Sequence, residues 1–278
     1  MSKKILISTG GSGGHVVPAT IIYKHLEHKF NVSMTSDFRG INFLNKDEYN
    51  LKVFNVKPIS QNIFLIPFHL FLIFFSIIKS IIFLKKDKID ILISTGGYMS
   101  FPLCLAAKIL NIRLFLFEPN MVLGRSNKFF ISMSEKIFCY SNDIKNFPNK
   151  SKNKIIVIPA LLRKMFYDVK FDNNIMDTIN ILIIGGSQRA KIFETLISSA
   201  LVKLSKRYKL KVYQQADFDN FENLRTTYKE NDIECELFDF NEDILNFMNR
   251  SNLCITRAGA STLAELSFLK IPYLAIPL

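Results

Sequence analysis

Residues 5–11 read Ile-Leu-Ile-Ser-Thr-Gly-Gly, and the same seven letters return at residues 91–97. A related run, Ile-Leu-Ile-Ile-Gly-Gly-Ser, stands at residues 181–187 and opens the second half of the chain. Each is a short aliphatic run followed by glycines and then a helical pattern, which is typical of a buried parallel strand that leads through a tight turn into a helix. The repeated run therefore predicts α/β architecture.

Outward from these three runs, aliphatic segments alternate with helical patterns along the whole chain. We predict strands near residues 3–8, 32–36, 89–94, 112–117, 136–140, 154–158, 179–184, 209–214, 234–238, 252–255 and 273–276. Such alternation predicts doubly wound parallel sheets. Because 278 residues of 49% apolar composition can bury two modest cores, we predict two domains, residues 1–160 and 161–278.

The cysteines and the N-terminus indicate a cytoplasmic protein. The four cysteines, Cys104, Cys139, Cys235 and Cys254, lie far apart with no paired spacing, so neither a disulfide framework nor a clustered metal site is predicted. The apolar run at residues 5–7 is too short for the core of a signal peptide. We therefore expect reduced, buried thiols and a chain that stays in the cytoplasm.

The net charge of +12 is confined to one part of the chain. Residues 1–155 hold 21 Lys and Arg against 9 Asp and Glu, whereas residues 156–278 hold 15 against 15. A basic domain beside a neutral one indicates an anionic partner, either a membrane surface or a nucleic acid, although a solvated Lys-rich surface is the plain alternative. No nucleic-acid motif accompanies the charge, so a nucleic-acid partner is disfavoured.

The segment Ile63–Leu84 is long and apolar enough to cross a bilayer, and Lys85, Lys86 and Lys88 follow it. Polar residues interrupt the segment, and the next predicted strand must return to the same sheet, which makes a true span awkward. A helix packed on the sheet explains only some of its apolar positions. We favour a partly exposed helix or hairpin that enters the interface of an anionic membrane without crossing it.

The first glycine run, Gly10–Gly14, precedes His15 and a helix with Pro18 in its first turn. Glycines let backbone N–H groups approach an anion, and a helix N-terminus adds partial positive charge. The run is neither a Walker A loop nor a clean dinucleotide fingerprint, and it could equally be a turn without a ligand. His15 is a candidate base, although a single histidine is often structural.

A second candidate site follows the strand predicted at residues 252–255. The segment Arg257–Glu265 has small residues and hydroxyls at a helix start, which suit a phosphate group. Glu265 can accept hydrogen bonds from two vicinal hydroxyls, as on a ribose. A well-capped helix with an exposed glutamate is the alternative interpretation.

Taken together, these residues resemble the MurG family of UDP-N-acetylglucosamine transferases across essentially the whole chain. The resemblance is carried by Gly10–Pro18, Gly96–Ser100 with Pro102, Glu118 with Asn120, Gly185–Gln188 and Arg257–Glu265. It implies a GT-B fold, in which two Rossmann-like domains face a cleft, the first taking a lipid-linked MurNAc-pentapeptide and the second UDP-GlcNAc. It also implies that the family continues beyond Leu278, so we expect a second domain that is incomplete at its C-terminus.

The resemblance implies roles for individual residues. His15 is the expected base, and we expect no cofactor and no metal at the sugar-nucleotide site. The expected substrate-binding residues are Ser12, Gly13, Gly14, Tyr98, Ser100, Asn120, Arg163, Ser187, Gln188, Asn241, Ala260, Ser261, Thr262, Leu263, Ala264 and Glu265.

The expected activity is the inverting transfer of GlcNAc from UDP-GlcNAc to undecaprenyl-pyrophosphoryl-MurNAc-pentapeptide, on the cytoplasmic face of the bacterial inner membrane. His15 would deprotonate the acceptor hydroxyl while Arg163, Ser187 and a helix N-terminus stabilise the leaving diphosphate. Two alternatives stay open. One is another GT-B transferase that acts on a glycolipid, and the other is an inactive membrane-bound module that binds the sugar nucleotide.

Overall fold

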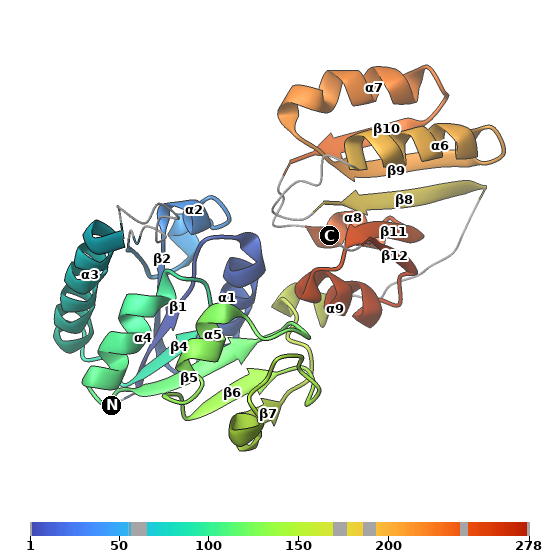
Figure 1. Ribbon diagram of the computed structural model, residues 1–278. Coiled ribbons are helices and arrows are strands. Elements are labelled where there is room, and N and C mark those ends of the chain that lie inside the picture. The colour runs from blue at the N-terminus through green and yellow to red at the C-terminus, as the bar shows by residue number, and fades with distance from the viewer. Residues whose placement is uncertain are drawn as a thin grey trace. The chain divides into compact units, whose positions relative to one another are not determined.

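The computed structural model describes residues 2–54, 56, 66–168, 177–185, 193–239 and 244–276. The chain divides into two compact units, Met1–Leu161 and Leu162–Leu278. Each unit is built on its own parallel sheet with helices on both faces, as the alternation of aliphatic segments and helical patterns predicts (Figure 1).

The first unit has seven strands among its described residues, in the order β3-β2-β1-β4-β5-β6-β7. They are β1 (Lys4–Ser8), β2 (Asn31–Ser36), β3 (Leu51–Val53), β4 (Ile91–Ser94), β5 (Arg113–Glu118), β6 (Lys136–Cys139) and β7 (Ile155–Val157). The helices are α1 (Gly13–Leu26), α2 (Phe38–Ile41), α3 (Ile66–Lys86), α4 (Ser100–Ile109) and α5 (Arg125–Phe130), with 3-10 turns η1 (Lys46–Glu48) and η3 (Asn149–Lys154).

The two copies of the repeated run lie side by side. β1 and β4 pair in parallel with Ile5 opposite Ile91 and Ser8 opposite Ser94, so identical residues face each other along the ladder. Strand residues alternate between the two faces of the sheet. Leu6 packs in one core with residues of α3, α4 and α5, while its neighbour Ile7 packs in another core with residues of α1. The three later helices therefore share one face, and α1 covers the opposite face.

The second unit has five strands among its described residues, in the order β10-β9-β8-β11-β12, all parallel. They are β8 (Thr178–Ile184), β9 (Lys209–Gln215), β10 (Glu234–Phe238), β11 (Leu253–Arg257) and β12 (Tyr273–Ile276). Around them lie η4 (Lys164–Phe166), the π-helical turn η5 (Phe193–Ile197), α6 (Ser198–Ser205), η6 (Phe218–Asn220), α7 (Phe221–Lys229), α8 (Ile244–Asn249) and α9 (Ala260–Phe268). α8 and α9 belong to one core and α6 and α7 to the other, one on each face of the sheet.

Every predicted strand is present, and each end lies within two residues of its prediction. The structure adds β3, which the sequence did not predict. This edge strand has only three residues and pairs with Met34–Ser36 of β2. Three residues are too few to show an alternating pattern, so its pairing depends on the strand beside it.

Candidate functional site

The first glycine loop connects β1 to α1 and is held by a buried carboxylate. Gly10 and Gly11 have φ values of +155° and +85°, which favour glycine over other residues. Asp37 is 2% exposed, and its Oδ1 accepts hydrogen bonds from the backbone N–H groups of Gly11 and Gly40, both at 2.8 Å. A Cβ on Gly10 would lie 2.9 Å from that oxygen. The backbone of the loop is therefore fixed before the helix begins.

α1 starts directly after this loop, and no side chain caps its first turn. Ser12 is the N-cap and makes no side-chain capping hydrogen bond, and the first turn contains no acidic residue. Gly13 is buried and Gly14 is exposed. The first N–H groups of a helix have no partner within the helix. They offer donors to a ligand beside Ser12 and Gly14.

His15 lies across the second glycine loop, which joins β4 to α4. Its Nδ1 is 2.9 Å from the carbonyl oxygen of Thr95, and the Thr95 hydroxyl donates to the carbonyl oxygen of His15 at 3.0 Å. Because a carbonyl only accepts, Nδ1 is the donor, and in the neutral ring Nε2 then holds the free lone pair. No described residue makes a hydrogen bond to Nε2. The structure thus presents the imidazole in the tautomer that a base requires.

Gly96 and Gly97 make room for this ring. Their φ values are +94° and +81°, and a Cβ on Gly96 would lie 3.2 Å from Cε1 of His15. Ser100 is fully buried, and its hydroxyl donates to the carbonyl oxygens of Gly96 and Gly97 at 2.6 and 3.0 Å. The Ser100 hydroxyl thus holds the loop, and its expected contact with substrate stays a prediction.

The loop after β5 is organised by a second buried carboxylate, that of Glu118. One of its oxygens accepts from the side chain of Asn120 at 2.9 Å, and the other accepts from the N–H of Gly124 and the side chain of Asn127 at 2.8 and 3.0 Å. Asn120 itself is exposed. Asn127 is buried, and its Oδ1 has no hydrogen-bond partner within the described part of the chain. A Cβ on Gly96 would lie 3.7 Å from Nδ2 of Asn127, so this amide lies close to the second glycine loop.

Tyr98 extends the site towards β2. Its hydroxyl accepts a hydrogen bond from Nη2 of Arg39, and the guanidinium carbon lies 5.1 Å from the centre of the Tyr98 ring. Oδ2 of Asp37 accepts from Nε and Nη2 of Arg39 at 3.4 and 3.3 Å. Burial raises the pKa of Tyr98, while Arg39 acts in the opposite direction. Tyr98 is therefore a neutral hydrogen-bonding group at neutral pH.

In the second unit, the predicted phosphate site at Arg257–Glu265 runs from the end of β11 into the first turns of α9. Gly259 is the N-cap and makes no side-chain capping bond, and Ala258 and Gly259 are exposed. The five following residues are partly exposed: Ala260, Ser261, Thr262, Leu263 and Ala264. The free N–H groups of this first turn form a site that suits an anion.

Glu265 is buried, contrary to the interpretation as an exposed residue of a capped helix. It is 2% exposed, and its two carboxylate oxygens accept from Nε and Nη2 of Arg163, both at 2.8 Å. The guanidinium carbon of Arg163 lies 5.2 Å from the centre of the Phe166 ring. The structure joins two predicted site residues that lie 102 positions apart in the sequence.

Three predicted site residues, Ser187, Gln188 and Asn241, lie outside the described residues. Gly185, which precedes two of them, is buried at the end of β8. Within the described ranges, no three His, Cys, Asp or Glu side chains gather in an arrangement that could hold a metal ion.

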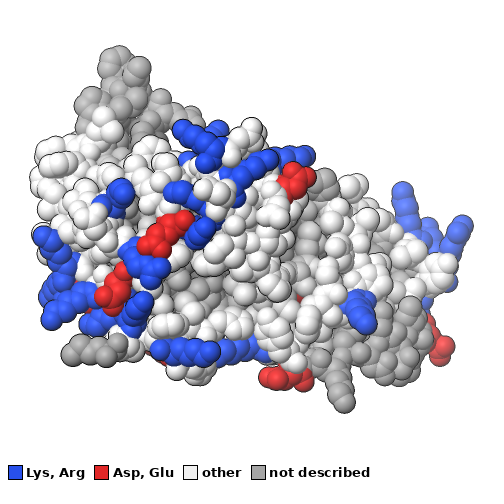
Figure 2. Space-filling model, turned by 90° about the horizontal axis from the view of Figure 1, so that it is seen from below, with Lys and Arg blue, Asp and Glu red and all other residues white. Residues whose placement is uncertain are grey.

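α3 carries the apolar segment that was predicted to meet a membrane. Among the described residues, Phe68–Lys86 is long and apolar enough to cross a bilayer by length and composition alone, but only 11% of its most apolar stretch is buried. Its exposed large side chains are Phe68, Leu70, Phe71, Phe74, Phe75, Ile78 and Ile82. Basic side chains outnumber acidic ones on the face drawn in Figure 2.

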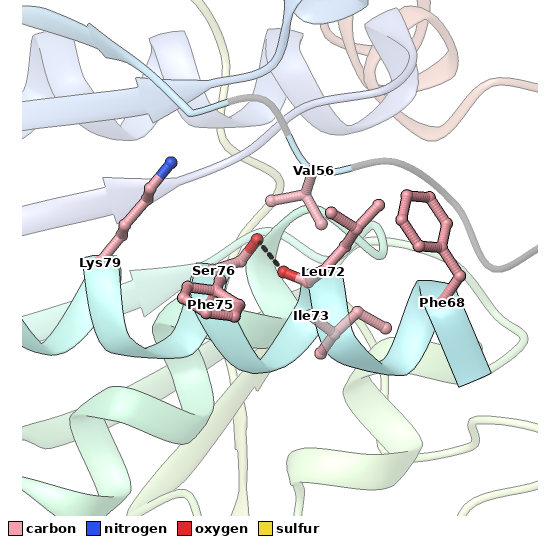
Figure 3. A pocket seen from close by; sticks show the side chains of 7 residues that line it. All are labelled: Val56, Phe68, Leu72, Ile73, Phe75, Ser76 and Lys79. Carbon is pink, nitrogen blue, oxygen red and sulfur yellow. Dashed lines mark hydrogen bonds between the residues drawn. The ribbon is translucent and has the colours of Figure 1, made fainter. Parts of the chain in front are cut away.

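A cavity of about 280 Å³ opens between α3 and Val56 (Figure 3). Two polar residues, Ser76 and the charged Lys79, line the cavity together with five apolar ones, Val56, Phe68, Leu72, Ile73 and Phe75. The Ser76 hydroxyl donates to the carbonyl oxygen of Leu72 within the helix at 2.8 Å, so it adds little polarity to the cavity.

Sequence reasoning missed the residues that hold the site together. Three of them lie outside every glycine run: Asp37, Arg39 and Asn127. The fourth, Thr95, acts on His15 through its backbone carbonyl group. Thr95 could have been found, because it lies within the repeated run that the sequence singled out. For the other three the sequence carries no local signal.

Comparison with protein families matches both units. The glycosyltransferase family 28 N-terminal domain matches residues 5–139, and the family 28 C-terminal domain matches residues 180–278.

Two relatives have the same descriptive name, UDP-N-acetylglucosamine–N-acetylmuramyl-(pentapeptide) pyrophosphoryl-undecaprenol N-acetylglucosamine transferase. The protein from Pelagibacter ubique (strain HTCC1062) is 68% identical over 278 residues, which are 100% of this chain and 78% of that protein. The protein from Rickettsia canadensis (strain McKiel) is 33% identical over 285 residues, with 99% of this chain and 79% of that protein covered.

Solved structures share the fold. The crystal structure of MurG from Acinetobacter baumannii matches with a TM-score of 0.74 at 23% identity and covers 100% of this chain and 79% of that one. The complex of MnaA from S. aureus with UDP matches with a TM-score of 0.69 at 16% identity, covering 98% and 78%. The predicted GT-B architecture is therefore confirmed.

Proposed function

The chain belongs to the MurG family within glycosyltransferase family 28, and on this premise we propose that its first unit takes the acceptor and its second unit the sugar nucleotide. It is an N-acetylglucosamine transferase that acts on undecaprenyl-pyrophosphoryl-MurNAc-pentapeptide with UDP-GlcNAc as donor, in peptidoglycan synthesis. The observation that carries the proposed chemistry is the position of His15, whose Nδ1 is engaged by the Thr95 carbonyl at 2.9 Å. That contact leaves Nε2 to take a proton.

In the proposed mechanism, the acceptor hydroxyl attacks the anomeric carbon of GlcNAc and gives its proton to Nε2 of His15. The bond between that carbon and the UDP oxygen breaks, and the diphosphate leaves with the electron pair. The backbone of Gly13 and Gly14, with Ser12 and Asn120, would contact the donor sugar. Tyr98 would contact the acceptor side, because it lies on the loop that holds His15.

The second unit would hold the nucleotide at α9. Residues 260–264 would bind phosphate and uridine through the free N–H groups of the first turn, and Glu265 would accept from the ribose hydroxyls. When the ribose hydroxyls compete with Arg163 for the carboxylate of Glu265, the guanidinium of Arg163 would become available to stabilise the diphosphate. Ser187, Gln188 and Asn241 remain proposed nucleotide contacts on the family resemblance.

We infer that α3 binds the cytoplasmic face of the bacterial inner membrane peripherally. The three helices on its face of the sheet, α3, α4 and α5, contain no Asp or Glu, while they carry Lys79, Lys85, Lys86, Lys108, Arg125 and Lys128. Exposed aromatic side chains can enter the interface, and lysines can contact anionic head groups. The cavity beside Lys79 would admit part of a hydrocarbon chain.

The test is turnover of UDP-GlcNAc with a short-chain lipid acceptor, beside calorimetric titration with UDP. His15→Ala should lower turnover by a factor of about 10²–10⁴, the usual effect of losing a positioned base, while UDP affinity stays within about twofold. His25→Ala is the matched control, since that histidine lies in the last turn of α1, away from the glycine loops.

Full turnover by the His15 variant would end its role as a base. UDP-GlcNAc binding without turnover by the unaltered chain would instead favour an inactive module that binds the sugar nucleotide. Turnover only with a different glycolipid would indicate another acceptor.

A further inference from the structure

We propose that Arg39 is an acceptor-binding residue that holds an anionic group of the acceptor beside the first glycine loop. The inference rests on the proposed function, because it presupposes an acceptor with phosphoryl and carboxylate groups. Arg39 belongs to none of the glycine runs or helix starts assigned above to a substrate.

The guanidinium is fixed from three directions. Asp37 holds Nε and Nη2 from the end of β2, and Tyr98 supplies its hydroxyl and its ring from the loop after β4. A Cβ placed on Gly11 would lie 3.3 Å from Nη2, so the group also lies against the loop after β1. In the sheet β1 lies between β2 and β4. The side chain of Arg39 therefore bridges the loops of three adjacent strands.

Part of the guanidinium is available to a ligand. The side chain is 56% exposed, and within the described ranges no group accepts a hydrogen bond from Nη1. A guanidinium presents donors in a planar fork that matches two oxygens of a phosphate or a carboxylate. Because Asp37 and Tyr98 already restrict its rotamers, binding an anion would order little additional side chain.

The surroundings favour an anion over a cation. Asp37 and Glu118 are 2% and 3% exposed, and N–H donors already occupy their carboxylates. The N-terminus of α1, a helix of 14 residues without an acid in its first turn, lies just after Gly11. The fork of Arg39 and this helix end thus offer positive potential on the loop that leads to His15. An anionic oxygen of the acceptor held there would place its sugar near the proposed base.

The test compares Arg39→Gln with a matched arginine. Like Arg39, Arg113 pairs with a carboxylate, that of Glu135, and its guanidinium carbon lies 5.3 Å from the centre of an aromatic ring, that of Phe115. Its side chain is 49% exposed. Unlike Arg39, it lies at the start of a strand, β5. We expect Arg39→Gln to raise the acceptor KM about 10- to 100-fold, the effect of losing charge-assisted hydrogen bonds, with the UDP-GlcNAc KM unchanged. Arg39→Lys should recover part of the loss, and Arg113→Gln should behave as the unaltered chain.

Two acceptor analogues identify the anion. One carries a monophosphate in place of the pyrophosphate, and the other carries amides in place of the peptide carboxylates. The defect of Arg39→Gln should shrink on the analogue that lacks the bound group. A defect of the same size on both analogues, or equal acceptor KM values for Arg39→Gln and Arg113→Gln, would overturn the proposal.

A binding measurement separates this inference from the proposed function. Fluorescence anisotropy with a labelled short-chain acceptor reports affinity without turnover. If the unaltered chain shows no turnover, the proposed function fails, yet weaker acceptor binding by Arg39→Gln than by Arg113→Gln would still support the site. Equal binding by both variants would refute it.

Discussion

The pair Arg163–Glu265 predicts that losing the arginine costs the second unit more stability than losing the glutamate. Arg163→Ala would leave Glu265, which is 2% exposed, without two hydrogen bonds of 2.8 Å. An uncompensated buried charge of this kind costs about 3–5 kcal/mol. Glu265→Ala would leave Arg163, whose side chain is 23% exposed and can turn towards water, so we expect about 1–3 kcal/mol. The double variant should fall short of the sum by about 2 kcal/mol.

The assay must report on α9, because a chain of two units need not unfold in one step. Hydrogen exchange across residues 253–268, measured for the unaltered chain, both single variants and the double variant, gives the local opening free energy. Arg225→Ala is the control, since this arginine pairs with the largely exposed Glu222 on α7. A larger loss for Glu265→Ala than for Arg163→Ala, or strictly additive losses, would refute the reasoning.

Three further predictions concern the first unit. Gly96→Ala should lower turnover by about 10²-fold or more at nearly unchanged UDP affinity, because the new Cβ would lie 3.2 Å from the His15 ring at a φ of +94°. Kinetics measures the turnover and calorimetry the UDP affinity, and equal losses of the two would contradict this prediction. Neutralising Lys85, Lys86 and Lys88 together should weaken binding to phosphatidylglycerol vesicles, measured by co-sedimentation, by roughly two orders of magnitude, at about 1 kcal/mol per lysine. If the chain stays bound both after these substitutions and after carbonate extraction of the membranes, α3 is instead a transmembrane helix. Burial raises the pKa of the Cys104 and Cys139 thiols to about 12, so at pH 8 an alkylating reagent should label them only after unfolding, and rapid labelling of the native chain, read by mass spectrometry, would show that the core opens.

The parallel sheets could be predicted because their signal is local. An aliphatic run that ends in glycines marks a buried strand whatever lies around it, so residues 5–11 and 91–97 and the related run at 181–187 fixed the α/β class. The exposure of α3 could also be predicted, since its helix has apolar side chains on more of its surface than one face of a sheet can cover.

The interactions within the site could not be predicted, because they join residues that are distant in the sequence. Asp37 reaches Gly11 across 26 positions, and Arg163 reaches Glu265 across 102. Ser100 is a related case, because the sequence does not show that its hydroxyl donates to the carbonyl groups of the loop itself. Sequence shows which polar groups are present, but their partners depend on the topology of the sheet.

The pairing of β1 with β4 bears on how the chain folds. The two strands and the turns after them are identical over seven residues, so neither backbone ladder nor side-chain packing can tell one from the other during sheet assembly. What distinguishes them is the helix that each strand enters: α1 packs against one face of the sheet and α4 against the other. The connections also run in opposite directions across the sheet, because α1 leads from β1 to β2 on one side and α4 leads from β4 to β5 on the other. The nascent protein therefore depends on the helices and connections that follow the two copies, rather than on the copies themselves, to place each strand.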